Sequence, residues 1–288
     1  MLAIYKKEMQ SYFTSMIAYL FMAVFVAVVG IYFTVYCVTG SVTDFAGYVL
    51  SGTSLWFAIL IPLITMRLWS EEKKSKTDQL LLTSPISVGK IVAGKYLAVV
   101  SLFVLTLAII MLFPFMLHFY GKVTWSTVMT GMLGYFLLGC ALMAIGFFIS
   151  TLTENQIVSA VITVVIIVAF YLLGSLANAF PGRARYSLVL CGVAIVGVMI
   201  LYYVSTKAIL PSVIFGVTGI GATALAYFLK PSIFDNGLSK FVEWFSVMDR
   251  FSNFAKGIID IADVIYFVSF IGVFLFLTVR SVEKNRWN

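Results

Sequence analysis

The stretch that decides the fold is IVAGKYLAVVSLFVLTLAIIMLFPFMLH, residues Ile91–His118, in which Lys95 is the one Lys, Arg, Asp or Glu. A run of about 20 apolar residues is long enough to cross the roughly 30 Å of hydrocarbon in a bilayer as a helix. Outward from this stretch, the chain contains further blocks of the same kind, which brings the predicted spans to eight. They cover residues 15–38, 48–68, 91–118, 126–151, 157–180, 188–204, 209–229 and 263–280.

The composition of the whole chain agrees with these blocks. Of its 288 residues, 62% are hydrophobic and only 11% are charged, whereas soluble domains have about 25% charged residues. We therefore predict an all-α integral membrane protein, built as a bundle of about eight transmembrane helices in a single transmembrane domain, residues 1–288.

The 19 Lys and Arg residues orient the predicted spans. With an even number of spans and an inner N-terminus, 12 of them fall on the inner side and 7 on the outer side. Four of those 7 lie in one long segment, which counts little toward the positive-inside rule, although Arg183 and Arg185 in a short loop go against it. Both termini are therefore predicted to be cytoplasmic. The net charge of +7 is explained by this asymmetry and by attraction to anionic lipids, so we predict no nucleic-acid partner.

Residues 1–14, MLAIYKKEMQSYFT, have the pattern of an amphipathic helix that lies in the membrane interface and leads into the first span. The expected apolar face consists of Leu2, Tyr5, Met9, Tyr12 and Phe13, and the polar face of Lys6, Lys7, Gln10 and Ser11. Because no small-residue cleavage site follows, we treat this segment as mature sequence and not as a signal peptide.

The segment GKIVAGKY, Gly89–Tyr96, is one residue short of the phosphate-binding P-loop G-x-x-x-x-G-K-[ST]. Tyr96 occupies the position where a Ser or Thr hydroxyl would hold Mg²⁺, no strand precedes the segment, and an apolar helix follows it. We therefore predict that this chain cannot hydrolyse ATP, and that Lys90 and Lys95 reach the inner membrane surface by snorkelling.

Other catalytic and metal-binding patterns are also incomplete. The single histidine, His118, is expected at the outer interface and cannot build a two-histidine site. Glu71 and Glu72 are expected to be solvated or to face a partner. Cys37, Cys140 and Cys191 stand singly in apolar runs and are expected to be buried. The nearly uncharged spans disfavour an ion-coupled carrier. An ion-coupled carrier or an intramembrane enzyme is nevertheless the alternative to the function that the resemblance described at the end of this section implies.

The longest inner segment, Arg67–Lys90, is expected to form a helix–turn–helix element on the cytoplasmic face. Ser84 and Pro85 have the pattern of an N-cap and first position of a new helix. Three consecutive leucines before them need a covering surface. The next inner segment contains Thr153, Glu154, Asn155 and Gln156, where a tight turn between helices is predicted and Thr153 and Gln156 have capping-box spacing.

The large outer segment, residues 230–262, is too polar to span the membrane. Its apolar residues recur at steps of three and four, which predicts amphipathic helices that lie on or dip into the outer leaflet. They are Phe241, Phe245, Met248, Phe251, Ala255 and Ile258. Such helices could gate an exit or brace the bundle, and the sequence leaves both open.

Hydroxyl and amide residues inside the predicted spans most often join helices to one another. The alternative is that some of them line a path for an amphiphilic substrate. The residues selected for such a path are Ser54, Thr65, Ser159, Thr163, Tyr171 and Asn178.

Four stretches in order make the chain similar to a known family. They are MLAIYKKEMQSYFTSMIAYLFMAVFVAVVGIYF from Met1, MRLWSEEKKSKTDQLLLTSPISVGKIVAGKY from Met66, GFFISTLTENQIVSAVI from Gly146, and RFSNFAKGIIDIADVIYFVSFIGVFLFLTVRSVEKNRW from Arg250. With these the chain resembles the permease subunits of type-2 ABC exporters, in particular the gliding-motility-type branch. The family commonly has Gly-Thr where this chain has Lys76-Thr77, and six spans where we count eight.

The resemblance implies a role for each element. Residues 1–14 become the elbow helix, and residues 67–90 become the loop with the coupling helix, which docks on a separate cytoplasmic ATPase. The contact residues implied are Glu71, Glu72, Thr77, Leu80, Leu81, Thr83, Ser84 and Pro85, with Thr153, Glu154, Asn155 and Gln156 as the second contact. The expected assembly has two ATPase subunits, which bind ATP and Mg²⁺, and a second permease chain, identical or related, in a bacterial plasma membrane. No cofactor is expected in this chain itself.

Overall fold

The computed structural model describes residues 1–83, 86–179, 244 and 246–287. The chain divides into two compact units, Met1–Ala169 with Val247–Asn288, and Phe170–Ser246. Within the described ranges the regular structure is helical, and no residue lies in a β-strand. For this part of the chain, the all-α prediction is confirmed.

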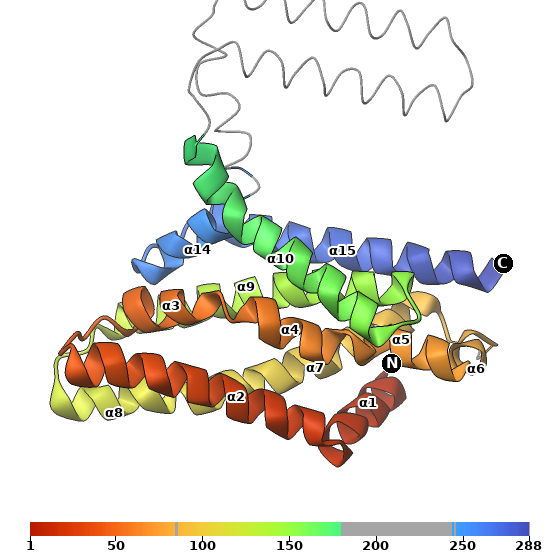
Figure 1. The fold of residues 1–288 in the computed structure, drawn as a ribbon, viewed down its shortest axis with the longest axis horizontal. Helices are drawn as coiled ribbons and strands as arrows, with labels where there is room; N and C mark the ends of the chain where they lie inside the picture. Colours follow the sequence, from red (N-terminus) through yellow and green to blue (C-terminus); the bar gives the residue numbers. More distant parts are fainter. Residues whose placement is uncertain (84–85, 180–243, 245, 288) are drawn as a thin grey trace, which may run out of the picture. The chain divides into compact units, whose positions relative to one another are not determined.

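Two helices joined at a sharp corner begin the first unit (Figure 1). Helix α1 (Leu2–Thr14) meets α2 (Met16–Phe33) at Ser15, whose extended backbone (φ −89°, ψ 151°) breaks the helical path. The predicted helix over residues 1–14 is confirmed, but its expected apolar face is partly wrong. Ile4 is buried, whereas Leu2 is 83% exposed, because α1 packs on its neighbour through Ile4 at Gly94.

The second predicted span is bent. After α2 the chain continues as the π-helix η1 (Thr34–Thr39), then returns through η2 (Phe45–Leu50), α3 (Ser51–Ser54), α4 (Phe57–Thr65) and α5 (Arg67–Ser75). The halves Phe45–Ser54 and Phe57–Ser75 meet at 58°. At the bend, the N–H groups of Trp56 and Ile59 donate to the carbonyls three residues before them, each at 3.0 Å, a 3₁₀-type pattern that interrupts the α-helix. The single run predicted over 48–68 is therefore broken in the structure.

The remaining described helices are α6 (Asp78–Thr83), α7 (Val88–Ile110), α8 (Leu112–Tyr120), α9 (Trp125–Leu152), α10 (Gln156–Ala179), α14 (Val247–Ala255) and α15 (Ile261–Trp287). Among the described residues, 5 helices are long and apolar enough to cross a membrane, and there are 6 if the bent pair is one span. They coincide with six of the predicted spans. The other two, 188–204 and 209–229, lie outside the described residues, so the prediction of about eight spans is not tested.

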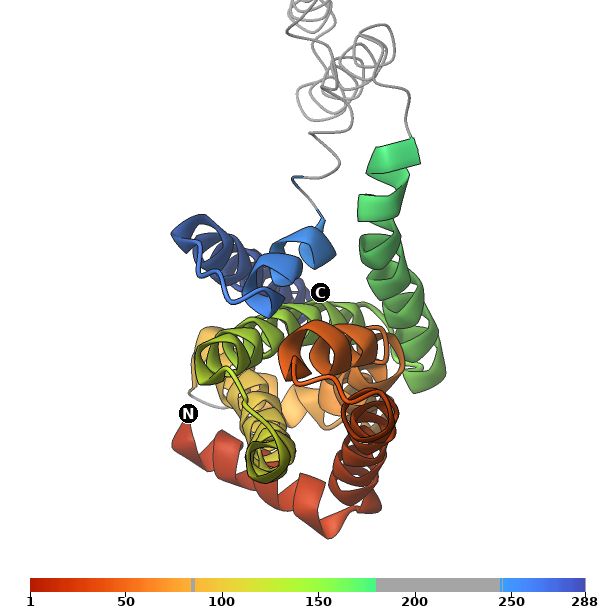
Figure 2. The same ribbon diagram turned by 90° about the vertical axis from the view of Figure 1, so that its left-hand side faces the viewer.

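Helix α9 packs against η2, α4, α5, α7, α14 and α15 and forms the centre of the first unit (Figure 2). Its glycines permit this close packing. A Cβ atom on Gly134, Gly139 or Gly146 would collide with a side chain of a neighbouring helix. Around these contacts lies a buried aromatic cluster of Phe25, Phe57, Phe103, Tyr135 and Phe251.

Helix α14 lies in the predicted outer segment and braces the bundle. Its buried residues Phe251 and Phe254 face inward, and Phe254 packs on Gly134 of α9. These contacts are those of a helix that braces the bundle, while a role in gating an exit stays a prediction. Of the expected apolar face, Ile258 is exposed, because α14 ends at Ala255 and Gly257 turns the chain with a φ of 84°. The part of this segment before residue 244 lies outside the described residues.

An ionic contact joins α14 to the first turn of α15. Arg250 Nη1 donates to Asp263 Oδ1 at 2.8 Å, and Asn253 Nδ2 donates to Asp263 Oδ2 at 2.8 Å. The Arg250 guanidinium also lies 4.3 Å from the ring centre of Tyr266. Both oxygens of the buried carboxylate are thus satisfied.

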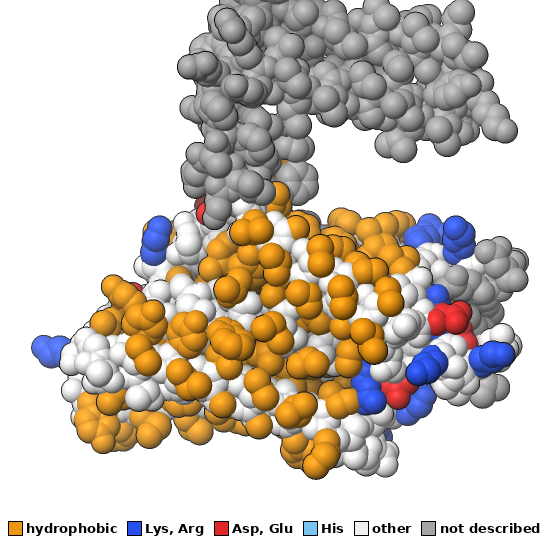
Figure 3. Space-filling model, viewed as in Figure 1, with side chains coloured by type: hydrophobic (Ala, Val, Ile, Leu, Met, Phe, Trp, Pro, Cys, Tyr) orange, Lys and Arg blue, Asp and Glu red, His pale blue; other side chains and the backbone are white. Residues whose placement is uncertain are grey.

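Charged side chains gather at one end of the face in Figure 3, where α1, α5 and the end of α15 lie, while the middle of this face is covered by hydrophobic side chains. The exposed charged residues of α1, α5 and the end of α15 include Lys6, Lys7, Glu71, Lys74 and Arg280. A charged end beside an apolar band is the arrangement that a membrane-spanning bundle requires.

Candidate functional site

The predicted helix–turn–helix element between the second and third spans is present. Helix α5 ends at Ser75, and Lys76 adopts the left-handed conformation (φ 56°, ψ 21°) in which its N–H reaches the carbonyls of the last turn. Thr77 N–H donates to Glu72 O at 3.0 Å, and α6 follows at once. Glycine is the usual residue at such a helix end, so Lys76 makes this turn at a cost of about 1 kcal/mol.

The side chains predicted for partner contact differ in exposure along this element. Glu71, Thr77 and Thr83 are exposed, and Leu81 is half-buried. The backbone of Leu80 is helical, while Ser84 and Pro85 lie outside the described residues. A new helix was expected from Pro85, but α7 begins at Val88 with Ser87 as its N-cap. Ile86 and Ser87 are not helical, so this expectation is wrong.

The second predicted contact segment lies beside the first. Lys73 Nζ of α5 donates to Thr151 O near the end of α9 at 2.6 Å. Ser70 Oγ of the same helix donates to Ser150 O at 2.9 Å. These two bonds fix α5 on the end of α9. The residues 153–156 that follow are therefore held next to the turn of the helix–turn–helix element.

Residues 153–156 form the tight turn that the sequence predicts, but the capping box does not form. Asn155 Oδ1 accepts from Ile157 N–H at 2.9 Å, and Thr153 Oγ1 donates to Asn155 O at 2.9 Å. Asn155 is thus the side-chain cap of α10, because the chain stays non-helical through Asn155 and α10 begins at Gln156. Glu154 is exposed.

An ionic cluster lies beneath this surface. Lys95 of α7 has a side chain that is only 1% exposed, and its Nζ lies 2.8 Å from Glu8 Oε1 and 3.0 Å from Glu72 Oε1. Lys7 Nζ lies 3.4 Å from the same Glu72 oxygen, and Lys95 also lies 5.7 Å from the ring centre of Trp69. The two positive and two negative charges compensate one another, which is the condition for burying them.

This cluster corrects two predictions. Lys95 does not snorkel, because its ammonium group is enclosed between carboxylates of α1 and α5. Glu72 is not solvated, because 92% of the residue's surface is covered, leaving 8% exposed. The sequence feature that could have revealed the ionic cluster was Lys95 itself. A lysine inside an otherwise uncharged apolar run needs a carboxylate partner when it is not at the end of the helix.

Helix α1 is tied to the bent span by a second buried group. The Tyr12 hydroxyl donates to Ile64 O at 3.4 Å. Burial raises the pKa of Tyr12, and the nearby negative charge of Glu8 raises it further. The hydroxyl therefore stays protonated and can act as a donor.

The family model described as ABC-2 family transporter protein matches residues 33–210, more than half of the chain. The chain belongs to the ABC-2 transporter family. No curated protein matches it. As a member of this family it is a multi-pass membrane permease of an ABC transporter, a transport subunit that is not itself the catalyst.

The residues predicted for a substrate path in this ABC-2 permease are largely engaged in helix packing. Ser54, Thr65, Ser159 and Thr163 are fully buried. Thr163 Oγ1 donates to Ser159 O at 2.7 Å, and Thr65 Oγ1 donates to Ile61 O at 3.0 Å. Tyr171 belongs to the other unit and is half-buried, and Asn178 is helical. Their role in a path stays a prediction.

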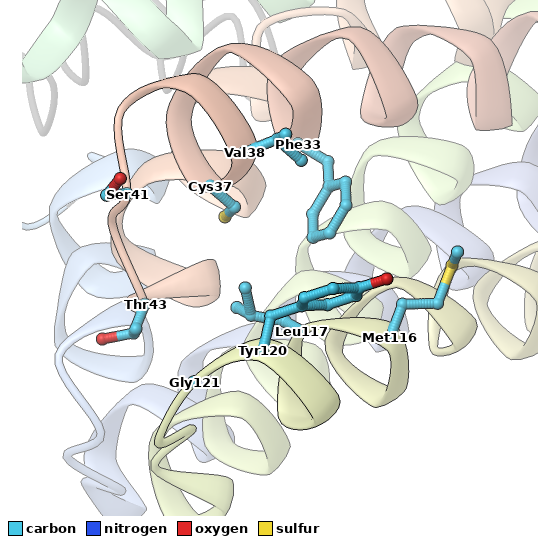
Figure 4. Close-up of a pocket in the computed structure, with 9 residues that line it drawn as sticks. All are labelled: Phe33, Cys37, Val38, Ser41, Thr43, Met116, Leu117, Tyr120 and Gly121. Atoms are coloured by element: carbon cyan, nitrogen blue, oxygen red, sulfur yellow. The ribbon is translucent and has the colours of Figure 1, made fainter.

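A pocket of about 550 Å³ lies at the opposite end from the ionic cluster, between η1 and α8 (Figure 4). Phe33, Cys37 and Val38 face Leu117 and Tyr120 across it, and the Cys37 sulfur points into the space. None of the predicted path residues lines this pocket. Cys37 and Cys140 are buried and free, as the sequence predicts, and Cys191 lies outside the described residues.

Proposed function

We propose that the chain is the permease subunit of an ABC exporter, which moves a substrate outward across the bacterial plasma membrane with energy from ATP hydrolysis on a separate ATPase. The family match carries this proposal. It is supported by the charged end of the bundle and by Lys73, which links the helix–turn–helix element to the end of α9, just before residues 153–156. ATP and Mg²⁺ are assigned to the partner, since Gly89–Tyr96 is the start of a helix with Tyr96 packed inside.

The proposed assembly contains two permease chains, identical or related, and two ATPase subunits. Both termini are assigned to the cytoplasm, and the four quoted stretches favour the gliding-motility-type branch. ATP binding brings the ATPases together and displaces the coupling elements, which shifts the bundle between two arrangements. The helix α6 and residues 153–156 are the surfaces assigned to ATPase contact.

The partner is tested by purifying the tagged chain from its own membranes in mild detergent and identifying co-purified proteins by mass spectrometry. A stoichiometric soluble protein with a complete P-loop, G-x-x-x-x-G-K-[ST], is the expected result. A second membrane chain would identify a heterodimer. Absence of an ATPase after gentle crosslinking, with transport that collapses with the proton gradient, would instead support an ion-coupled carrier.

The docking surface is tested by Leu81→Asp, with Gln79→Asp as the matched control on an exposed position of the same helix. Loss of an apolar contact at the centre of an interface costs about 2 kcal/mol or more, so we expect ATPase binding to weaken by about 30-fold or more. The control variant is expected to bind nearly normally. Equal binding by both variants, at equal expression, would remove α6 from the docking surface.

A further inference from the structure

The ionic cluster joins two parts of the first unit that are each held together without it. One part is α1 on α7. Tyr5 Oη donates to Ser101 Oγ at 3.0 Å. At Gly94, a Cβ atom would lie only 3.2 Å from Met1 O and 3.3 Å from Ile4, so the two helices are in close contact. The Glu8–Lys95 ion pair lies within this part.

The other part is α5 on α9. It is held by the hydrogen bonds of Ser70 and Lys73 to the carbonyls of Ser150 and Thr151. Glu72 lies on the same helix, but its carboxylate points the other way, to Lys95 of α7 and Lys7 of α1. The Glu72 carboxylate is therefore an ionic link from α5 to the α1–α7 pair.

The link is asymmetric. Lys95 is shared between two carboxylates, and the Glu8 contact at 2.8 Å is the shorter one. Glu72 uses one oxygen for both lysines, while its Oε2 is buried without a hydrogen-bond partner among the described residues. If α5 moves, Lys95 keeps Glu8 as its counter-charge and is not left alone in an apolar helix. Releasing Glu72 therefore costs less than opening an isolated buried ion pair.

We propose that Glu72 is a positioning residue that holds the coupling element in its resting position through Lys95, and that displacement of α5 by the ATPase separates Glu72 from Lys95 while Glu8 stays paired. The role in coupling rests on the proposed function. Glu72 lies one turn before the Lys76 turn into α6, so a force on α6 reaches this contact through a short and continuous piece of chain.

The test measures the distance between spin labels at Gln10 of α1 and Lys74 of α5, two exposed positions. The labels are attached in a chain whose 3 cysteines are replaced by serine. Distances are recorded by double electron–electron resonance for the full chain alone in lipid nanodiscs. They are recorded again for the complex with the co-purified ATPase, without nucleotide and with ATP under conditions that block hydrolysis.

For Glu72→Gln in the chain alone, we expect a second distance between the two labels, which belongs to the arrangement with α5 displaced. Its population is expected to rise about tenfold relative to the unsubstituted chain, the ratio that ~1.4 kcal/mol produces. In the complex, the same distance is expected to dominate when ATP is bound to the unsubstituted chain. Glu71→Gln is the matched control for the chain alone, because Glu71 is exposed and its partner Arg67 lies on the same helix, 3.5 Å away. It is expected to leave the distances of the chain without ATPase unchanged.

Lys7→Gln provides a second variant that does not disturb a buried group, since the Lys7 side chain is 61% exposed. It weakens the second contact of Glu72 and is expected to shift the distances in the same direction by a smaller amount. If Glu72→Gln matches Glu71→Gln, or if Glu72→Gln does not fold and Lys7→Gln has no effect, the inference is overturned. Failure to find any ATPase would overturn the proposed function. The distances measured for the chain without ATPase would still show whether Glu72 holds α5 on the α1–α7 pair.

Discussion

The contact between α14 and α15 allows a quantitative prediction for Arg250→Met. This change removes the charged partner of Asp263, whose side chain is 5% exposed, and leaves Asn253 as its remaining donor. Breaking a fully buried ion pair costs about 3–5 kcal/mol. Because the Arg250 side chain is 17% exposed and one neutral hydrogen bond remains, we expect a loss of about 3 kcal/mol, with the lost contact to Tyr266 included.

The assay is thermal unfolding of the purified chain in one detergent, followed by intrinsic fluorescence. With an unfolding entropy of about 2.1 cal/mol/K per residue, a loss of this size corresponds to a decrease in Tm of about 5 °C for 288 residues. The control is Lys256→Met, at an exposed position just after the same helix, where we expect a change within about 0.5 kcal/mol. Adding Asp263→Asn to Arg250→Met should recover part of the loss, because an amide needs no counter-charge. A Tm for Arg250→Met equal to that of the control would refute the idea that this ion pair holds α14 on α15.

Two further substitutions test the packing of α9. Gly139→Ala forces a methyl group against the Phe103 ring, so we expect a loss of about 1–3 kcal/mol by overpacking, measured by the same Tm shift. Gly272→Ala, where nothing lies within 4 Å, should be neutral or stabilising, and equal effects of the two alanines would contradict this packing. Tyr135→Phe removes the 2.9 Å hydrogen bond to Thr53. Since Thr53 keeps its bond to a backbone carbonyl, we expect a loss of about 1 kcal/mol, and a loss above about 3 kcal/mol would show that the hydroxyl has another role.

The straight apolar helices could be predicted from sequence to within a few residues because hydrophobic length alone fixes them. The run predicted over 126–151 is α9, Trp125–Leu152. The bend in the second span could not be predicted in this way. It is a local change to backbone hydrogen bonds that reach three residues back, at Trp56 and Ile59, and a hydropathy pattern is the same whether such a helix is straight or bent.

The sequence predicts the surface residues of the candidate site, but it does not predict the ionic cluster beneath them. Exposed positions such as Glu71 and Thr83 follow from a polar segment between two spans. The partners of Lys95 do not, because Glu8 is 87 positions away and Glu72 lies on a third helix. Periodicity shows which face of a helix is apolar, but it does not say which helix will cover that face. The position of α1 across α7 had to be known before Glu8 could be assigned to Lys95.

The buried lysine also has a consequence for how the protein enters the membrane. Lys95 lies about 10 Å from the start of α7 at Val88, given a rise of 1.5 Å per residue. A lysine opposes insertion of a helix into lipid by about 2.5–3.5 kcal/mol at mid-membrane. Glu8 and Glu72 both precede Lys95 in the chain, so both counter-charges have been synthesised when α7 leaves the ribosome. The order of the charges along the sequence therefore allows Lys95 to enter the membrane together with a carboxylate partner during translation.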